Sequence, residues 1–132
     1  MLKVLLVIGA GGLMAGQAFA DPVADGQAYF KSNCSACHAN TATQTGKPGP
    51  TLYGVVGRKV GSVPGFSYST TLKGAGLKGE TWTSANLDVF LTNPQRARPG
   101  TYMPVSVANP ASRAVLIAYL GSLTASAPGA GK

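Results

Sequence analysis

The sequence predicts an all-α domain with three main helices and long connecting loops. Three segments place apolar residues at helical spacing, and the long stretch between the first two shows no sustained strand-like alternation. That stretch, residues 39–81, is rich in Gly, Pro, Thr and Ser. A structureless loop of this length is unusual inside a compact domain. It becomes understandable if the loop wraps a bound group that replaces part of the core.

The first helix is expected over residues 22–33. Asp21 is placed to cap its N-terminus, and Pro22 occupies the first helical position, where the missing N–H has no intrahelical partner to lose. Four residues then share one face of the helix at helical spacing. They are Val23, Gly26, Tyr29 and Phe30.

Two further helices are expected near the C-terminal end. One covers residues 84–91 and is capped by Thr83 or Ser84. The other covers residues 110–123, with Asn109 as its cap and a proline in its first turn. Its apolar stripe is the clearest in the chain. The stripe consists of Val115, Leu116, Tyr119, Leu120 and Leu123.

Residues 1–20 follow the pattern of a cleaved secretory signal peptide. A basic Lys3 precedes an apolar run that ends in Ala-Phe-Ala, so cleavage is expected after Ala20. The alternative is an uncleaved membrane anchor, but the run is short for a bilayer span and is interrupted by glycines. The mature domain would be residues 21–124. Residues 125–132 are expected to form a disordered tail.

The charge balance is positive, with 11 basic residues against 4 acidic ones. Cleavage would remove Lys3 and leave a net charge of +6. The basic residues form no run of five or six and are not interleaved with aromatic residues, which argues against a nucleic-acid groove. Scattered positive charge could steer the protein to an acidic protein partner, or it could only aid solubility.

Both cysteines and the only histidine lie within the sequence CSACH, from Cys34 to His38. A disulfide across two residues would restrain the chain very little. A thioredoxin-like dithiol belongs near the strand–helix junction of a βαβ unit, and the preceding segment here reads as a helix. A closed zinc site needs four protein ligands, but the carboxylates of this chain are few and distant.

Covalent haem attachment is the interpretation that fits the pattern Cys-x-x-Cys-His. Cys34 and Cys37 would form thioether bonds to the two vinyl groups of the porphyrin, and His38 would ligate the iron. Met103 follows as the second iron ligand by elimination, because it is the only methionine left after the signal peptide is removed. A His/Met pair would fill both axial sites and leave electron transfer as the natural activity.

At this point the sequence resembles class I cytochrome c of the mitochondrial and bacterial short-chain kind. The resemblance covers nearly all of residues 21–123. The matching segments are CSACH, GPTLYGVVGRKVGSVPGFSYS, TWTSANLDVFLTNP, PGTYMP and LIAYL. The implied structure is the all-α cytochrome c fold, with three main helices and long loops wrapped around one covalently attached haem c.

The resemblance also implies roles for single residues. The carbonyl of Pro50 would accept a hydrogen bond from the ring nitrogen of His38. Gly26 and Phe30 would contact the last helix. The residues expected to hydrogen-bond the haem propionates are Arg58, Tyr68 and Trp82.

Several positions around the expected haem crevice depart from the family pattern. A tyrosine, an asparagine, a phenylalanine and two lysines of the family are replaced, and residues 70–81 form a longer segment than in mitochondrial members. The departures are Phe90, Leu72, Val105, Tyr102 and Gln95. They bear on the reduction potential and on the docking partner, and they leave the expected cofactor unchanged.

The sequence therefore predicts a monohaem, one-electron carrier that is not an enzyme and is exported to a bacterial periplasm. The implied partners are redox proteins, namely a quinol–cytochrome c oxidoreductase, a terminal oxidase, or a periplasmic dehydrogenase or reductase. A monomer is expected that binds no nucleic acid and meets membranes only through its partners. One alternative is a haem peroxidase or gas-binding sensor with a labile Met103. Another is a thiol–disulfide oxidoreductase.

If Cys34 and Cys37 hold the haem covalently, acidified acetone should leave the colour with the protein. Thioether bonds survive this extraction, whereas it removes a haem held only by contacts. Absorbance of the protein pellet and of the solvent gives the answer. Colour in the solvent would show that the thioether assignment is wrong.

Overall fold

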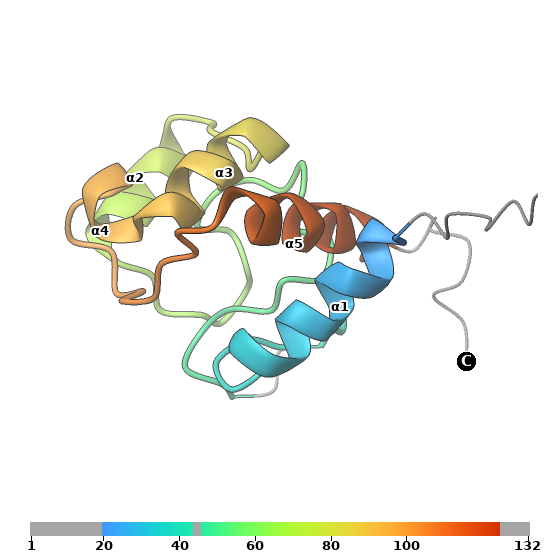
Figure 1. Cartoon of the computed structure of the whole chain (residues 1–132). Coiled ribbons are helices and arrows are strands. Elements are labelled where there is room, and N and C mark those ends of the chain that lie inside the picture. Colours follow the sequence, from blue (N-terminus) through green and yellow to red (C-terminus); the bar gives the residue numbers. More distant parts are fainter. Residues whose placement is uncertain (1–19, 44–45, 125–132) are drawn as a thin grey trace, which may run out of the picture.

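The computed structural model describes residues 20–43 and 46–124. Across these residues the fold is all-helical (Figure 1), which confirms the predicted class. The β pairing among the described residues is an isolated bridge between Lys59 and Thr81. The predicted leader up to Phe19 and the predicted tail lie outside the described residues. The helices are α1 (Pro22–Asn33), α2 (Thr70–Leu77), α3 (Ser84–Thr92), α4 (Pro94–Ala97) and α5 (Pro110–Ser122).

The three predicted helices begin at polar caps. The carboxylate of Asp21 accepts a hydrogen bond of 3.0 Å from the second residue of α1. Thr83, rather than Ser84, caps α3, and its hydroxyl accepts from the backbone N–H of Asn86 at 3.1 Å. The side chain of Asn109 caps α5 in the same way and accepts a hydrogen bond of 3.1 Å from the backbone N–H of Ser112. Side-chain caps satisfy N–H groups that the first turn of a helix leaves unpaired.

The prediction that residues 39–81 form only loop is wrong, because Thr70–Leu77 forms α2. Two glycines lower its intrinsic helix propensity, and the segment has no long apolar stripe. Packing stabilises it instead. A Cβ on Gly76 would lie 2.2 Å from the carbonyl oxygen of Val60, so the helix contacts the loop backbone directly there.

The short helix α4 was also missed. Pro94 lies just beyond the end of α3 and occupies the first turn of this helix. The side chain of Asn93 accepts a hydrogen bond of 3.0 Å from the backbone N–H of Arg96 and so caps that turn. Proline suits the first helical position, because the N–H group that it lacks has no intrahelical partner there.

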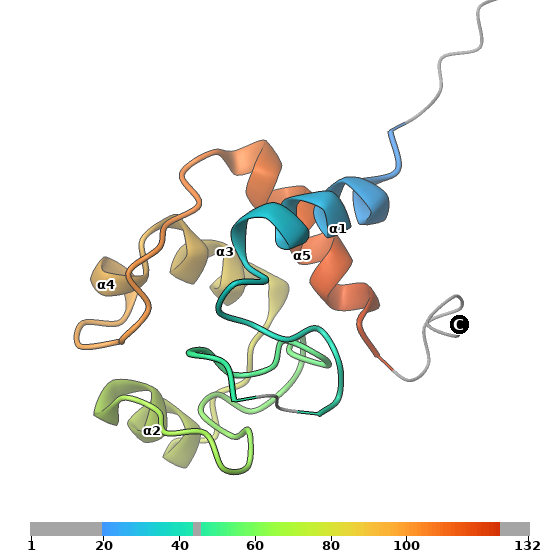
Figure 2. The ribbon, with the colours of Figure 1, turned by 90° about the horizontal axis from the view of Figure 1, so that it is seen from below.

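α1 crosses α5 at close range, as Figures 1 and 2 both show. A Cβ on Gly26 would lie 2.0 Å from the carbonyl oxygen of Val115 and 2.6 Å from the Cβ of Tyr119. Next to this contact, the rings of Phe30 and Tyr119 lie 5.6 Å apart. Glycine therefore lets the two helix backbones meet.

α3 and α4 lie beside each other, and α2 stands apart from both (Figure 2). α3 packs against α5, and a backbone hydrogen bond of 2.7 Å from Val107 to Leu91 joins the segment before α5 to α3. α2 lies on the far side from the α1–α5 crossing. No helix among the described residues has the length and apolar character needed to span a bilayer.

Replacing Gly26 with alanine should destabilise the protein by about 1–3 kcal/mol or more, because overpacking forces the α1 and α5 backbones apart. The matched control is Gly74→Ala, at an α2 position where a Cβ would meet nothing within 4 Å. The free energy of unfolding of this control should rise by about 0.5–1 kcal/mol. Thermal unfolding of the two variants provides the comparison, and a Gly26→Ala variant as stable as the control would contradict it.

Candidate functional site

A cavity of about 320 Å³ lies between α3, α5 and the long loops. Its volume falls within the range of about 300–1,000 Å³ that is usual for small-molecule and cofactor sites. Leucines of α3 and α5 form much of its wall, including Leu87, Leu116 and Leu120. The fold also brings together there all eight residues singled out from the sequence. These are Cys34, Cys37, His38, Pro50, Arg58, Tyr68, Trp82 and Met103.

The cysteines occupy a turn directly after α1. The backbone N–H groups of Cys37 and His38 both donate to the carbonyl of Cys34, at 3.1 and 2.9 Å. The N–H of Cys34 donates to Phe30 on α1 at 2.8 Å. Because α1 is fixed against α5, this turn is fixed too, and it presents two thiols and an imidazole to the same cavity.

Cys34 and Cys37 are not joined by a disulfide bond. Burial raises the pKa of the Cys34 thiol to about 11, and the neighbouring Cys37 contributes a smaller rise. The turn also follows helix α1 and not a strand, so the two cysteines lack the strand–helix setting of a thioredoxin-like dithiol. The described residues also contain no group of three or more His, Cys, Asp or Glu side chains suited to holding a metal ion.

The ring of His38 is held on one side by backbone. Its Nδ1 lies 2.7 Å from the carbonyl oxygen of Pro50. A Cβ on Gly49 would lie only 2.4 Å from Cε1 of the ring, so glycine is required for this approach. Burial is the main cause that lowers the pKa of His38, against a smaller rise from the Pro50 carbonyl. A neutral imidazole whose Nδ1–H donates to a carbonyl leaves Nε2 as an electron-pair donor.

The loop that carries Met103 is held by two side chains outside it. The Nε2 atom of Gln95 donates to the carbonyls of Thr101 and Met103, at 2.6 and 3.1 Å. The hydroxyl of Thr71 donates to the carbonyl of Pro99 at 2.6 Å. The sequence offered no signal for Thr71, and Gln95 stood out only as a departure from a lysine. Met103 itself is partly buried and packs against the core.

An ion pair adds a further link between the α2 region and this loop. Arg98 donates from Nη2 to the carboxylate of Glu80, and both side chains are partly exposed. This hydrogen bond is the main cause that lowers the pKa of Glu80. Surface pairs of this kind contribute little stability individually, but here the pair joins two segments that both border the cavity.

Arg58 is anchored beside the cavity by loop carbonyls. Its Nη1 and Nη2 donate to the carbonyls of Tyr53 and Thr51, each at 2.9 Å. Its Nε is buried and has no hydrogen-bond partner among the described residues. Burial lowers the pKa of this guanidinium. A buried cation with an unpaired N–H calls for an anionic acceptor in the adjacent space.

Two aromatic residues complete this side of the cavity. The hydroxyl oxygen of Tyr68 accepts a hydrogen bond of 3.1 Å from the backbone N–H of Val63, so its own proton is left to donate elsewhere. Burial raises the pKa of that hydroxyl. Trp82 is bonded through its backbone N–H to the carbonyl of Arg58 at 2.8 Å, which sets the two residues side by side. The Trp82 ring lies 5.0 Å from that of Phe90.

These features fit a haem c group. The walls are predominantly apolar, as a porphyrin requires. The unpaired Nε of Arg58 lies where a propionate would find a donor. The thiols and the imidazole come from one turn of backbone and face the same space. The apolar walls thus suit the porphyrin ring, and the Arg58 donor suits a propionate.

Comparison with known proteins gives one consistent family. The family model described as cytochrome c matches residues 23–124. Cytochrome c2 of Rhodomicrobium vannielii is 41% identical over 121 residues, 89% of this chain and 93% of the relative. Cytochrome c2 of Agrobacterium tumefaciens is 42% identical over 99 residues, 74% of this chain and 88% of the relative.

A solved structure agrees with these relatives. The structure of cytochrome c2 from Rhodospirillum centenum superposes with a TM-score of 0.70 at 32% identity, covering 80% of this chain and 99% of that one. This similarity confirms the expected fold. The chain belongs to the cytochrome c family.

Proposed function

We propose that the protein is a monohaem electron carrier whose haem c is attached through Cys34 and Cys37. The observation that carries this proposal is that both cysteines, His38 and Met103 line one apolar cavity together. Membership of the cytochrome c family supports covalent haem c as the cofactor. When bound, the haem supplies an iron centre that changes oxidation state by one electron.

His38 and Met103 are the proposed axial ligands. The Pro50 carbonyl holds the Nδ1–H of His38, which orients the ring and leaves Nε2 to bind iron. Met103 offers a soft, neutral thioether, which favours the reduced metal and raises the potential. With His38 and Met103 both bound to it, the iron would have no open position for a substrate. The chain then acts by holding one geometry in both oxidation states.

Arg58, Tyr68 and Trp82 are the proposed donors to the propionates. The N–H of Arg58 at Nε and the O–H of Tyr68 are left without acceptors by their contacts within the described protein. Burying a carboxylate without such donors would be costly. These residues therefore bind the polar edge of the cofactor, while the leucines of α3 and α5 exclude water from its ring.

The alternative of a peroxidase or gas sensor needs Met103 to leave the iron readily. The contacts of Gln95 and Thr71 with the Met103 loop oppose such movement. The geometry therefore favours an electron carrier over a haem enzyme. The predicted leader and the bacterial relatives named cytochrome c2 support a periplasmic location.

The proposed partners are other redox proteins, met at the surface next to Met103. Tyr102 and Val105 flank Met103 with exposed fractions of 72% and 48%, and both also line the cavity. Arg98 is engaged by Glu80. Lys31 and Arg96 form no ion pair with the described residues, so their charge remains to steer an acidic partner. Contacts of this class are small and short-lived.

Replacing Met103 with alanine should open the sixth position. The weak near-infrared sulfur-to-iron band of the oxidised protein should vanish, and the reduced protein should bind CO rapidly. The potential should fall by ~0.1 V or more, within the ~0.8 V span that axial ligands control. Spectroscopy and potentiometry measure these changes. Val105→Ala, two residues along the same loop, is the control and should keep the band. A Met103→Ala variant with the wild-type spectrum would refute the ligation.

Electron exchange with small charged probes should reveal the steering field. The rate with an anionic cyanoiron complex should fall as salt is added, because charges are screened over ~8 Å at physiological ionic strength. The rate with a cationic cobalt complex should rise. Stopped-flow kinetics at several salt concentrations tests both. Rates that do not change with salt for either probe would contradict electrostatic steering.

A further inference from the structure

We propose that Arg113 is a positioning residue that holds the Met103 loop closed on the iron. This inference rests on the proposed ligation by Met103. Arg113 lies on α5, does not line the cavity, and is only 8% exposed. No feature of the sequence pointed to it, because it falls within the pattern of the last helix.

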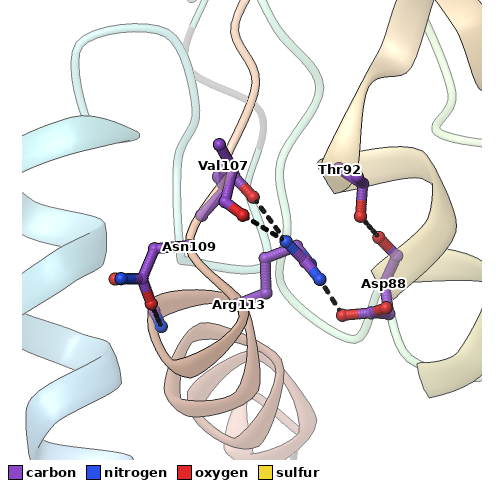
Figure 3. Close-up of polar contacts among 7 residues, drawn as sticks. Asp88, Thr92, Val107, Asn109 and Arg113 are labelled. Carbon is purple, nitrogen blue, oxygen red and sulfur yellow. Dashed lines mark hydrogen bonds and ion pairs between the residues drawn. The ribbon is translucent and has the colours of Figure 1, made fainter.

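Arg113 reaches two different parts of the structure (Figure 3). Its Nη1 donates to the carbonyls of Val107 and Ala108, at 3.0 and 2.9 Å. Its Nε donates to the Asp88 carboxylate on α3 at 2.8 Å. One guanidinium therefore connects α5, α3 and the segment that follows Met103. Hydrogen bonds from a charged donor are stronger than neutral ones.

The carbonyl contacts fix the far end of the ligand loop. Val107 is 4% exposed and lines the cavity, and its N–H donates to Leu91 at the end of α3. Its N–H and its C=O are thus both held. At the near end, Gln95 and Thr71 hold the carbonyls of the loop around Met103. With both ends tied, the sulfur of Met103 has few conformations in which to leave the cavity.

A simpler role for Arg113 would be to brace α3 against α5 through Asp88 alone. The two roles use different bonds of the same side chain. In the simpler role, losing Asp88 should affect the loop as much as losing Arg113. In the proposed role the carbonyl bonds matter, and their loss leaves the buried carbonyl of Val107 without its charged donor.

Three holoprotein variants and one control separate these roles. Arg113→Met keeps an unbranched apolar chain and removes every donor. Arg113→Lys keeps a charge that can serve one acceptor. Asp88→Asn removes the ion pair and leaves the carbonyl contacts in place. Tyr119→Phe is the control, because Tyr119 lies on the same helix as Arg113. It removes the hydrogen bond of 2.8 Å that Asn40 donates to the Tyr119 hydroxyl, and it does not touch the loop.

Three readouts report on the loop. They are the rate of CO binding to the reduced protein, the sulfur-to-iron band of the oxidised protein, and hydrogen exchange of the Val107 amide. Arg113→Met should bind CO about tenfold faster or more, the change expected from losing one hydrogen bond to a charged group. Its band should weaken and its Val107 amide should exchange faster. Arg113→Lys should fall between Arg113→Met and wild type.

Asp88→Asn and Tyr119→Phe should bind CO at close to the wild-type rate. If Arg113→Met binds CO no faster than Tyr119→Phe, the positioning role is overturned. An Asp88→Asn variant that binds CO as fast as Arg113→Met would overturn it as well. Absence of the sulfur-to-iron band in the wild-type protein would instead refute Met103 ligation itself. Failure of the inference and failure of the proposed function therefore give different results.

Discussion

The close crossing of α1 and α5 at Gly26 determines where the rest of the site can lie. α1 ends at Asn33, and the turn with Cys34 follows at once. α5 contributes Leu116 and Leu120 to the cavity wall, with 1% and 2% exposure. A fixed contact between the two backbones therefore sets the distance between the attachment turn and the opposite apolar wall. Because the contact is backbone to backbone, no side-chain rearrangement could absorb a change in it.

Local features of the sequence predicted much of the site, because several of its residues lie close together in the sequence. The pattern from Cys34 to His38 lies within one turn of backbone, so its spacing alone indicated the attachment. The caps at Asp21 and Asn109 act within three residues of where they stand. The family resemblance extended this to Pro50 and Arg58. The structure places these chemically different residues around the same cavity.

What the sequence could not predict depends on contacts between distant segments. α2 has glycines where a helix would favour alanine, and it forms because Gly76 packs on the Val60 backbone. The bond from Thr71 to Pro99 joins residues 28 positions apart. For α2 and for this bond, tertiary packing outweighs the local signal. α4 is different, because it begins at a local cap, the side chain of Asn93.

The two proposed axial ligands depend on different kinds of support. His38 directly follows Cys37, so the covalent attachment and the Pro50 carbonyl would keep it near the iron under most conditions. Met103 has no covalent tie and depends on side chains from α2, the α4 region and α5. Of the two proposed ligands, Met103 is therefore the one whose binding would be adjustable. Loosening a distant support such as Arg113 would change the lability of the ligand while leaving attachment intact. On this proposal, the contacts of the Met103 loop would determine how readily the ligand leaves, and the attachment site would not.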